Sequence, residues 1–423
     1  MKQSIYSWSL WLALLALALV PTSPAKAYGV LTHQAVIDAS WETSLKPLLQ
    51  RRYPYASEAD LKKAHAYAYG GSIVQDMGYY PFGNTFFTDL THYVRSGDFV
   101  ESLLRHADTV EELGFALGAM AHFYSDTYGH PIGTNRAVPL VYPKVRQEYG
   151  DTVTYADDAI SHVKTEFGFD VLQVARGSYA PEAYQDFIGF EVAEELLEEA
   201  FLETYGLELQ DVFTSLKLAI GSYRYTIRGL FPELTKAAWQ AKKSKIQEED
   251  ASMTRRKFVY RMSRASYHAQ WGQEYERPHF FARAVAWVLR VLPKVGPLRP
   301  LAFVPPPPAA EELYLNSFNV TVDNYTAQVK QLRPNAPQLH NIELDTGKPS
   351  HPDAYPLTDE TYHKLLKKLA KSDFEQVRPP LQQHMLSFFA QAKAPAAQDE
   401  DDQKEWEEIQ EYLVQLEGLQ ANR

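Results

Sequence analysis

The chain has 423 residues, of which 45% are hydrophobic and 22% charged, so it is long enough to bury a sizeable core. Its formal net charge of −11 argues against a broad basic surface, and no stable nucleic-acid partner is expected. The sequence contains no cysteine, which excludes disulfides and zinc–thiolate sites. Any bound metal ion must therefore be held by His, Asp, Glu or backbone groups.

The first 27 residues have the pattern of a signal peptide. Lys2 supplies a positive charge, residues 5–20 are almost entirely apolar, and Ala25 and Ala27 form an Ala-x-Ala cleavage pattern. Cleavage there would make Tyr28 the first residue of an exported protein, either periplasmic or secreted. The alternative is an uncleaved N-terminal anchor, for which the apolar run is short.

Residues 28–300 are predicted to form one all-α, multi-helix domain, because their apolar residues recur at helical spacing and long alternating runs are scarce. A small-residue stretch at 114–121, flanked by large apolar side chains, predicts a buried helix. Residues 191–203 carry acidic residues on one side and apolar residues on the other, which predicts an amphipathic helix. Proline and glycine at 131–143 predict an irregular connector.

The remaining chain is predicted to be a mostly helical extension behind a proline-rich connector. Residues 301–356 form this connector, since the four prolines at 305–308 favour an extended chain, and residues 318–322 are expected as a short strand. Residues 357–423 are predicted as a helical tail that Pro379 and Pro380 interrupt. The sequence decides neither the role of residues 301–423 nor the oligomeric state.

One short segment carries three residues with metal-binding chemistry. His122, Asp126 and His130 are spaced by four, and on a helix each such step rotates by only about 40°, so the three side chains share one face. Imidazole and carboxylate groups are the zinc ligands open to a chain without cysteine. We expect Pro131 and Gly133 to end this helix and leave His130 at its mouth.

A second pair repeats this spacing. His162 and Glu166 are four residues apart and lie within a predicted helix. A surface ion pair would explain this pair if it stood alone. Together, the two sets are typical of the inward-facing ligands of metal-bearing helical bundles.

These motifs resemble the zinc-dependent phospholipase C superfamily, which also contains single-strand-specific zinc nucleases and glycosylphosphatidylinositol phospholipase D. Members of this superfamily are all-α and hold three zinc ions. The resemblance covers residues 28–166, where every expected ligand appears in order. The sequence departs from the pattern of the superfamily in two places. Tyr28 replaces the Trp that is usual in the nuclease branch, and the step from Asp126 to His130 is four residues instead of six.

The resemblance implies a trinuclear site with one ligand set for each ion. One zinc ion would be held by four side chains: Asp76, His92, His122 and Asp126. A second would take the terminal amine and carbonyl of Tyr28, together with His33 and the other oxygen of Asp126, which bridges the pair. A third would be held by three side chains: His130, His162 and Glu166.

The expected function is phospholipase C-type hydrolysis of a phospholipid by zinc-bound hydroxide. Asp126 and Asp76 would be the catalytic residues, with Asp76 orienting or deprotonating the attacking water. The substrate would be a phospholipid or another phosphodiester, and the head group stays open. A phospholipid substrate would also allow peripheral contact with a membrane. Two alternatives remain at this point: a single-strand-specific zinc nuclease, and a helical zinc-binding protein without turnover.

Overall fold

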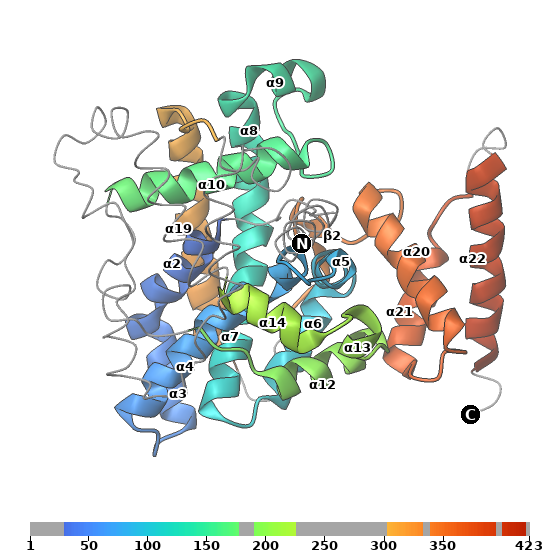
Figure 1. The fold of residues 1–423 in the computed structure, drawn as a ribbon, viewed down its shortest axis with the longest axis horizontal. Coiled ribbons are helices and arrows are strands. Elements are labelled where there is room, and N and C mark those ends of the chain that lie inside the picture. Colours follow the sequence, from blue (N-terminus) through green and yellow to red (C-terminus); the bar gives the residue numbers. More distant parts are fainter. Residues whose placement is uncertain (1–28, 177–189, 226–302, 333–338, 395–399, 420–423) are drawn as a thin grey trace, which may run out of the picture.

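The computed structural model describes a chain that is almost entirely helical, over residues 29–176, 190–225, 303–332, 339–394 and 400–419 (Figure 1). The predicted all-α class is confirmed. Strands occur in the described part only as one two-stranded hairpin. No helix of that part combines the length and the apolar character needed to cross a bilayer. The predicted signal peptide, residues 1–27, and Tyr28 lie outside the described residues.

Two long helices, α4 (Glu58–Gly71) and α7 (Val110–Tyr128), pack closely against each other. Each begins with a capping box, which satisfies backbone N–H groups at the start of the helix. A Cβ atom at Gly118 would lie 2.1 Å from the carbonyl oxygen of Ala68, so glycine is what allows the two backbones to approach. The buried helix predicted from residues 114–121 is thus confirmed as part of α7.

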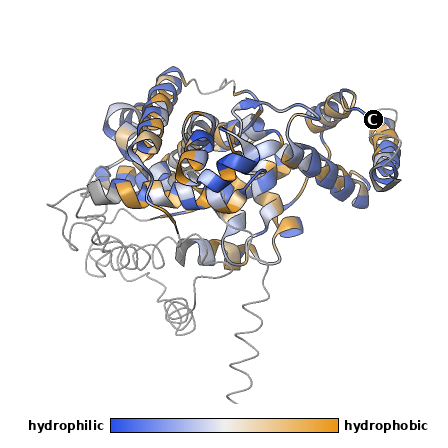
Figure 2. Cartoon of the chain, turned by 90° about the horizontal axis from the view of Figure 1, so that it is seen from above, coloured by the Kyte–Doolittle hydropathy of each residue, from blue (hydrophilic) through white to orange (hydrophobic). Residues whose placement is uncertain are grey.

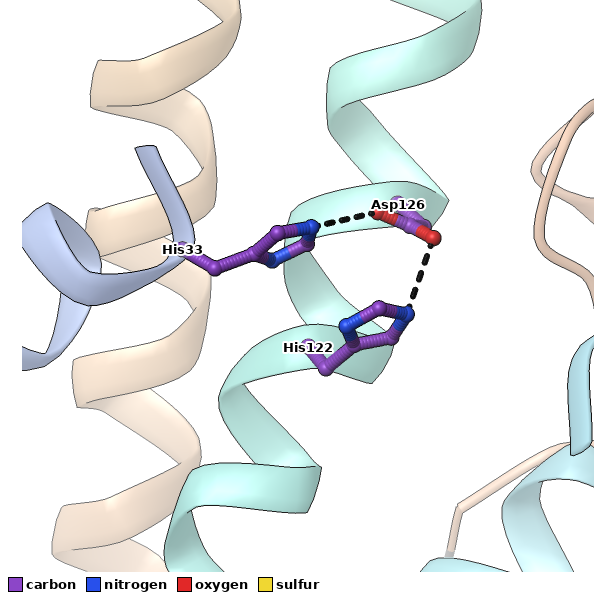
Figure 3. A group of neighbouring side chains, drawn as sticks. All are labelled: His33, His122 and Asp126. Atoms are coloured by element: carbon purple, nitrogen blue, oxygen red, sulfur yellow. Dashed lines mark ion pairs between the residues drawn. The ribbon is translucent and has the colours of Figure 1, made fainter. Parts of the chain in front are cut away.

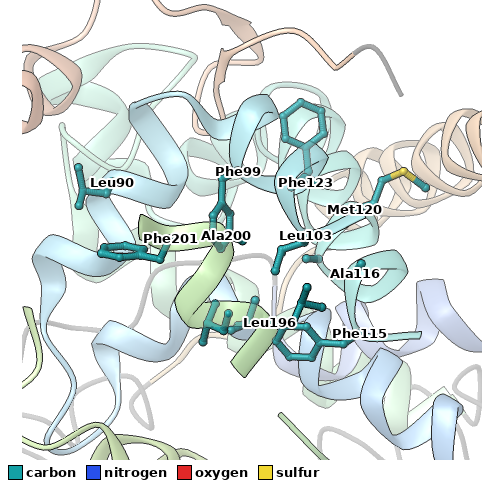
Figure 4. Close-up of a cluster of buried hydrophobic side chains, with 14 of the residues drawn as sticks. Leu90, Phe99, Leu103, Phe115, Ala116, Met120, Phe123, Leu196, Ala200 and Phe201 are labelled. Atoms are coloured by element: carbon teal, nitrogen blue, oxygen red, sulfur yellow. The ribbon is translucent and has the colours of Figure 1, made fainter. Parts of the chain in front are cut away.

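The hydrophobic core continues from α7 into α6 (Ser96–His106) and α12 (Glu194–Tyr205) (Figure 4). Phe99 of α6, Phe115 of α7 and Phe201 of α12 are all fully buried. Burying one such side chain stabilises the fold by roughly 1.5–3 kcal/mol. The packing of α6 and α12 therefore holds α7, which carries candidate ligands, in a fixed position.

Further helical elements surround this core. Helix α5 carries His92 and α10 carries His162 and Glu166. The elements of this part are α2 (Val30–Ser40), η1 (Trp41–Leu45), α3 (Lys46–Arg52), η2 (Val74–Tyr79), α5 (Thr85–Tyr93), α8 (Asn135–Val141), α9 (Pro143–Tyr149), α10 (Ala159–Arg176), α13 (Leu209–Val212) and α14 (Leu216–Tyr225).

The expected helix end at Pro131 and Gly133 is wrong. The chain passes from α7 into a π-helical turn, η3 (Gly129–Thr134), and then directly into α8, so residues 131–141 are helical instead of irregular. A π-helical turn widens the backbone and disturbs the regular hydrogen-bond ladder, which accommodates a residue that lacks an N–H group. His130 therefore lies inside a helical segment and not at a helix mouth.

The connector expected at 301–356 also differs from the structure. Residues 308–331 form the 24-residue helix α19 (Pro308–Gln331), which includes the segment 318–322 that was expected as a strand. The buried positions of α19 recur every three or four residues, but they include Ser317 and Thr321. Because these two residues are polar, the sequence shows no continuous hydrophobic stripe along this face. The packing of α19 against α7 and η3 outweighs the preference of its valines for β-strands. The predicted domain boundaries themselves stay predictions.

Three further helices lie together on the side of the molecule opposite to α2, α3 and α4 (Figure 1). They are preceded by the hairpin of β1 (Ile342–Glu343) and β2 (Lys348–Pro349). Hydrophilic and hydrophobic residues are interleaved along the helices, as expected for helices with one buried face (Figure 2). The predicted break at Pro379 is confirmed, since a new helix begins there. The three helices are α20 (Pro356–Lys371), α21 (Pro379–Phe389) and α22 (Glu400–Gly418).

Candidate metal centre

The centre of the candidate site is the carboxylate of Asp126, which α7 holds at 0% exposure. One helical turn earlier, the Nε2 atom of His122 lies 3.1 Å from Oδ2 of Asp126. His33 reaches the same carboxylate from α2, with its Nε2 atom 3.5 Å from Oδ1 (Figure 3). The two imidazoles thus face different oxygens of one carboxylate, which is the geometry that a bridging ligand requires.

Two more histidines approach Asp126. The Nε2 atom of His92, from α5, lies 3.3 Å from Oδ2, and the Nε2 atom of His130, from η3, lies 3.6 Å from Oδ1. Asp76, from η2, is next to this group, with its Oδ1 atom 3.6 Å from Nε2 of His92. All of these residues are at most 2% exposed. Four separate segments of the chain, namely α2, η2, α5 and the continuous pair of α7 and η3, therefore converge on one buried cluster.

Backbone carbonyl groups set the orientation of two of these imidazoles. The Nδ1 atom of His122 lies 3.0 Å from the carbonyl oxygen of Ser72, and Nδ1 of His92 lies 2.8 Å from that of Thr88. A carbonyl oxygen only accepts hydrogen bonds, so each ring carries its proton on Nδ1 and presents a lone pair at Nε2. The two Nε2 atoms are 3.3 Å apart. Two lone pairs that face each other at this distance favour a cation between them.

Three side chains form a second group beside this cluster. The rings of His130 and His162 are stacked with their centroids 5.0 Å apart. The Nδ1 atom of His162 lies 2.9 Å from Oε1 of Glu166, one turn later on α10. All three side chains are buried. The predicted pair at 162 and 166 is therefore part of an interior site and is not a surface ion pair.

The structure brings together all eight side chains that the resemblance implied as ligands. They form three groups, in each of which one ligand atom per residue lies within 4.8 Å of the others: Asp76, His92 and His122; His33, His122 and Asp126; and His130, His162 and Glu166. Within the described part of the chain, neither oxygen of Asp126 accepts a hydrogen bond, although both are buried. A buried, oxygen- and nitrogen-lined cluster of this kind fits zinc ions.

The pKa shifts of Asp126, His33 and His92 suit metal binding. At His122 and His130, burial lowers the pKa, but the charge of Asp126 outweighs burial and raises it, to about 9 for His130, so a metal ion must displace a proton there. Burial opposes the charge on Asp126, but the neighbouring His122 and His130 outweigh burial and hold its pKa well below the usual value. Burial and then His122 lower the pKa of His33 well below its ordinary value. The pKa of His92 is also lowered, mainly by burial. An ionised carboxylate and neutral imidazoles are the forms that bind a metal ion.

Three polar residues near this centre were not predicted from the sequence. Asp170 lies one turn after Glu166 on α10 and accepts hydrogen bonds from the backbone N–H groups of Leu31 and Thr32, at 2.9 and 3.1 Å. Extending the four-residue series from His162 and Glu166 would have found it. Asn135 and Asp345 also contact the second group, but they lie outside any local motif.

The chain was compared with known proteins. It matches no curated protein and no solved structure. Residues 31–215 match the family described as zinc dependent phospholipase C. This segment contains every side chain of the three groups. The match over residues 31–215 supports the resemblance to the zinc-dependent phospholipase C family that the ligand spacing indicated.

Proposed function

We propose that this protein is an exported zinc-dependent phosphodiesterase that hydrolyses a phospholipid in the manner of a phospholipase C. The observation that carries the proposal is the position of Asp126, whose two oxygens each face two imidazoles inside a buried cluster. The family supports zinc-dependent phospholipase C-type chemistry in general. Export, the choice of a phospholipid and the roles of individual residues are the finer parts of the proposal.

The proposed site holds three zinc ions. Asp126 would contribute to two of these ligand sets, one with His92 and His122 beside its Oδ2 atom and the other with His33 beside its Oδ1 atom. Asp76 completes the first ligand set, and the terminal amine and carbonyl of the mature N-terminus complete the second. The third ion is held by His130, His162 and Glu166, the separate group described above.

When bound, zinc ions lower the pKa of water toward neutrality and offset the negative charge of a phosphodiester. The chain's own residues fix the geometry for this chemistry. Ser72 and Thr88 lock the rings of His122 and His92 through their carbonyl oxygens, so these donors need no rearrangement. Asp76 lies at the edge of the cluster and orients the attacking water or takes a proton from it.

The proposal is tested with the secreted, zinc-loaded protein. Its N-terminus is sequenced, its zinc content is measured, and its activity is assayed on phosphatidylcholine vesicles and on denatured DNA in parallel. We expect a mature N-terminus at Tyr28, about three zinc ions per chain, as the resemblance implies, and release of the phosphorylated head group. Hydrolysis of DNA without hydrolysis of the lipid would instead identify a nuclease.

A control separates an enzyme from a zinc-binding protein without turnover. Bis-p-nitrophenyl phosphate reports phosphodiester hydrolysis whatever the natural substrate is. We expect this activity to disappear with a chelator and to return when zinc is added. Tightly bound zinc without hydrolysis of any of these three substrates would refute the enzymatic function.

A further inference from the structure

The hairpin formed by β1 and β2 lies far outside residues 31–215, yet its turn reaches the metal-ligand cluster. Asp345, in this turn, is fully buried. Its Oδ2 atom accepts hydrogen bonds from the phenol groups of Tyr93, at 2.8 Å, and Tyr355, at 2.5 Å. Two donors on one oxygen fix the orientation of the carboxylate. The other oxygen, Oδ1, lies 3.8 Å from the Nδ1 atom of His130.

The backbone of the same residue supports a second histidine. The carbonyl oxygen of Asp345 accepts a hydrogen bond of 2.7 Å from the side-chain Nδ2 atom of Asn135. This contact leaves the amide oxygen of Asn135 facing Nε2 of His162, at 2.8 Å. An amide oxygen only accepts, so His162 carries its proton on Nε2. Its Nδ1 atom is then unprotonated and faces Glu166, as a metal ligand must.

The hairpin is seated closely against the helices that carry the ligands. Gly347 has a φ angle of +67°, and a Cβ atom there would lie 2.6 Å from the carbonyl oxygen of Thr127 at the end of α7. The backbone N–H of Leu344 donates to the carbonyl oxygen of His92, at 3.2 Å. The turn that presents Asp345 is therefore fixed relative to both α5 and α7.

We propose that Asp345 is a positioning residue of the group His130, His162 and Glu166. Its carboxylate acts on the Nδ1 side of His130 through its charge, across 3.8 Å, and its carbonyl oxygen, through Asn135, orients His162. Carboxylates and carbonyl groups that contact the outer nitrogen of a metal-binding histidine hold the ring in place and make it a better donor. This inference rests on the proposed metal site. It assigns part of that site to a segment outside residues 31–215.

The test measures zinc affinity, so that it does not depend on catalysis. In the full-length zinc protein, Asp345→Asn removes the charge and keeps the size of the side chain. We expect the affinity for one zinc ion to fall about 10- to 100-fold in a chelator competition, while the other ions stay within about twofold. Cobalt substituted at the weakened position should also show an altered visible spectrum, because its ligand geometry changes.

Glu343→Gln is the matched control, since Glu343 is a buried carboxylate of the same hairpin whose Oε2 atom accepts from Thr346 within the turn. We expect its zinc affinities and cobalt spectrum to equal those of the wild type. Equal affinities in Asp345→Asn and the wild type would overturn the inference, as would an equal loss in both variants. If wild-type protein binds no zinc, the proposed function fails instead, so the two failures are distinguishable.

If Asp345→Asn does not fold, Tyr355→Phe tests the same inference. This variant deletes one of the two hydrogen bonds on Oδ2 and leaves the carboxylate in place. We expect the affinity for the same zinc ion to fall by about 10-fold, the lower end of the range expected for Asp345→Asn. An unchanged affinity in folded Tyr355→Phe, as judged by circular dichroism, would contradict the positioning role.

Discussion

The segment that carries the ligands and the C-terminal segment bury different kinds of side chains. Between residues 29 and 225 the interior holds a cluster of histidines and carboxylates surrounded by apolar core. Between residues 303 and 419 it holds mostly aromatic and aliphatic groups, and the side chain of Asp345 reaches the candidate ligand His130. Ligands thus come from one segment, and part of their support comes from the other.

The C-terminal segment itself is divided. Helix α19 and the hairpin pack against the ligand-bearing helices and also hydrogen-bond to them, as in the 2.9 Å hydrogen bond from Tyr325 to the carbonyl oxygen of Leu117 on α7. Helices α20 and α21 meet through apolar contacts, such as the stacked rings of Tyr362 and Phe388, whose centroids are 3.5 Å apart. We therefore expect changes near the hairpin to affect metal binding and changes in α20–α22 to affect stability alone.

The largest effect is expected at the centre of the ligand-bearing segment. Asp126→Ala removes the carboxylate that four imidazoles face, so we expect at least two zinc ions to be lost and kcat/KM to fall by about 1000-fold or more. Metal analysis and the bis-p-nitrophenyl phosphate assay measure both. Glu311→Gln, a buried carboxylate of α19 outside the three groups, is the control and should keep its zinc. Full metal content in Asp126→Ala would contradict the proposal that Asp126 contributes to two zinc sites.

A second change tests the packing that holds α7 in place. In Gly118→Ala the new Cβ atom would meet the carbonyl oxygen of Ala68 at 2.1 Å, so the helices must separate, at a cost of about 3 kcal/mol in the free energy of unfolding. Gly221→Ala on α14 meets nothing within 4 Å and should be neutral or stabilise by up to about 1 kcal/mol. Urea denaturation measures both variants. Equal stability of the two would show that α4 and α7 are not constrained by this contact.

A site residue could be predicted from the sequence where its relation to the other ligands is visible within a short stretch of chain. His122, Asp126, His162 and Glu166 were found because four-residue spacing on a helix is visible in the sequence. Asp345 was not found, because its partner Tyr93 lies 252 positions away and no spacing rule links them. The resemblance, and not periodicity, supplied His33, Asp76 and His92. Tyr28 lies outside the described residues, so its role as a ligand stays a prediction.

The fold shows the same limit. The all-α class followed from helical periodicity, which is a local property. Helix α19 was missed because its buried face includes Ser317 and Thr321, whose burial comes from contacts with distant helices. The helical turn at His130 was missed because Pro131 normally ends a helix, whereas a π-helical turn accommodates it here.

A third prediction concerns the stability of the C-terminal helices. Burial, with a further effect of Arg95, lowers the pKa of His384 on α21 to about 4. The unfolded chain, with a pKa near 6.5, binds this proton more readily, so the contribution is complete above about pH 6.5 and is lost as the pH falls toward 4. We expect a loss of up to about 3 kcal/mol across this window in the wild type.

The matched variant is His384→Gln, which cannot titrate but can still hydrogen-bond to Tyr362. The difference in unfolding free energy between wild type and variant, measured at pH 7 and at pH 4.5, isolates the contribution of this histidine. We expect zinc affinity at pH 7 to be the same in both proteins. A pH-independent difference would contradict the buried, neutral state of His384.

The smallest effect is expected on the surface of the C-terminal helices. Lys367 of α20 and Glu408 of α22 form an exposed ion pair with a 2.7 Å contact. Exposed pairs of this kind contribute little and are screened by salt. Lys367→Ala should leave the melting temperature and the zinc content within experimental error, at low salt and at high salt. A clear drop in zinc content would show that α20–α22 also affect metal binding, as α19 and the hairpin are expected to do.

The long-range contacts of α19 and the hairpin have a consequence for the order of events during folding. Thr32 and Tyr314 hydrogen-bond across 282 positions of the chain. Contacts of such separation are reached slowly, because a long loop must close before the contacts that stabilise it can form. We expect the mature centre to assemble late, after the two distant segments have met. A nascent chain that stops before the hairpin lacks Asp345, so under the proposed function we expect it to bind the ion of His130, His162 and Glu166 more weakly than the complete chain does.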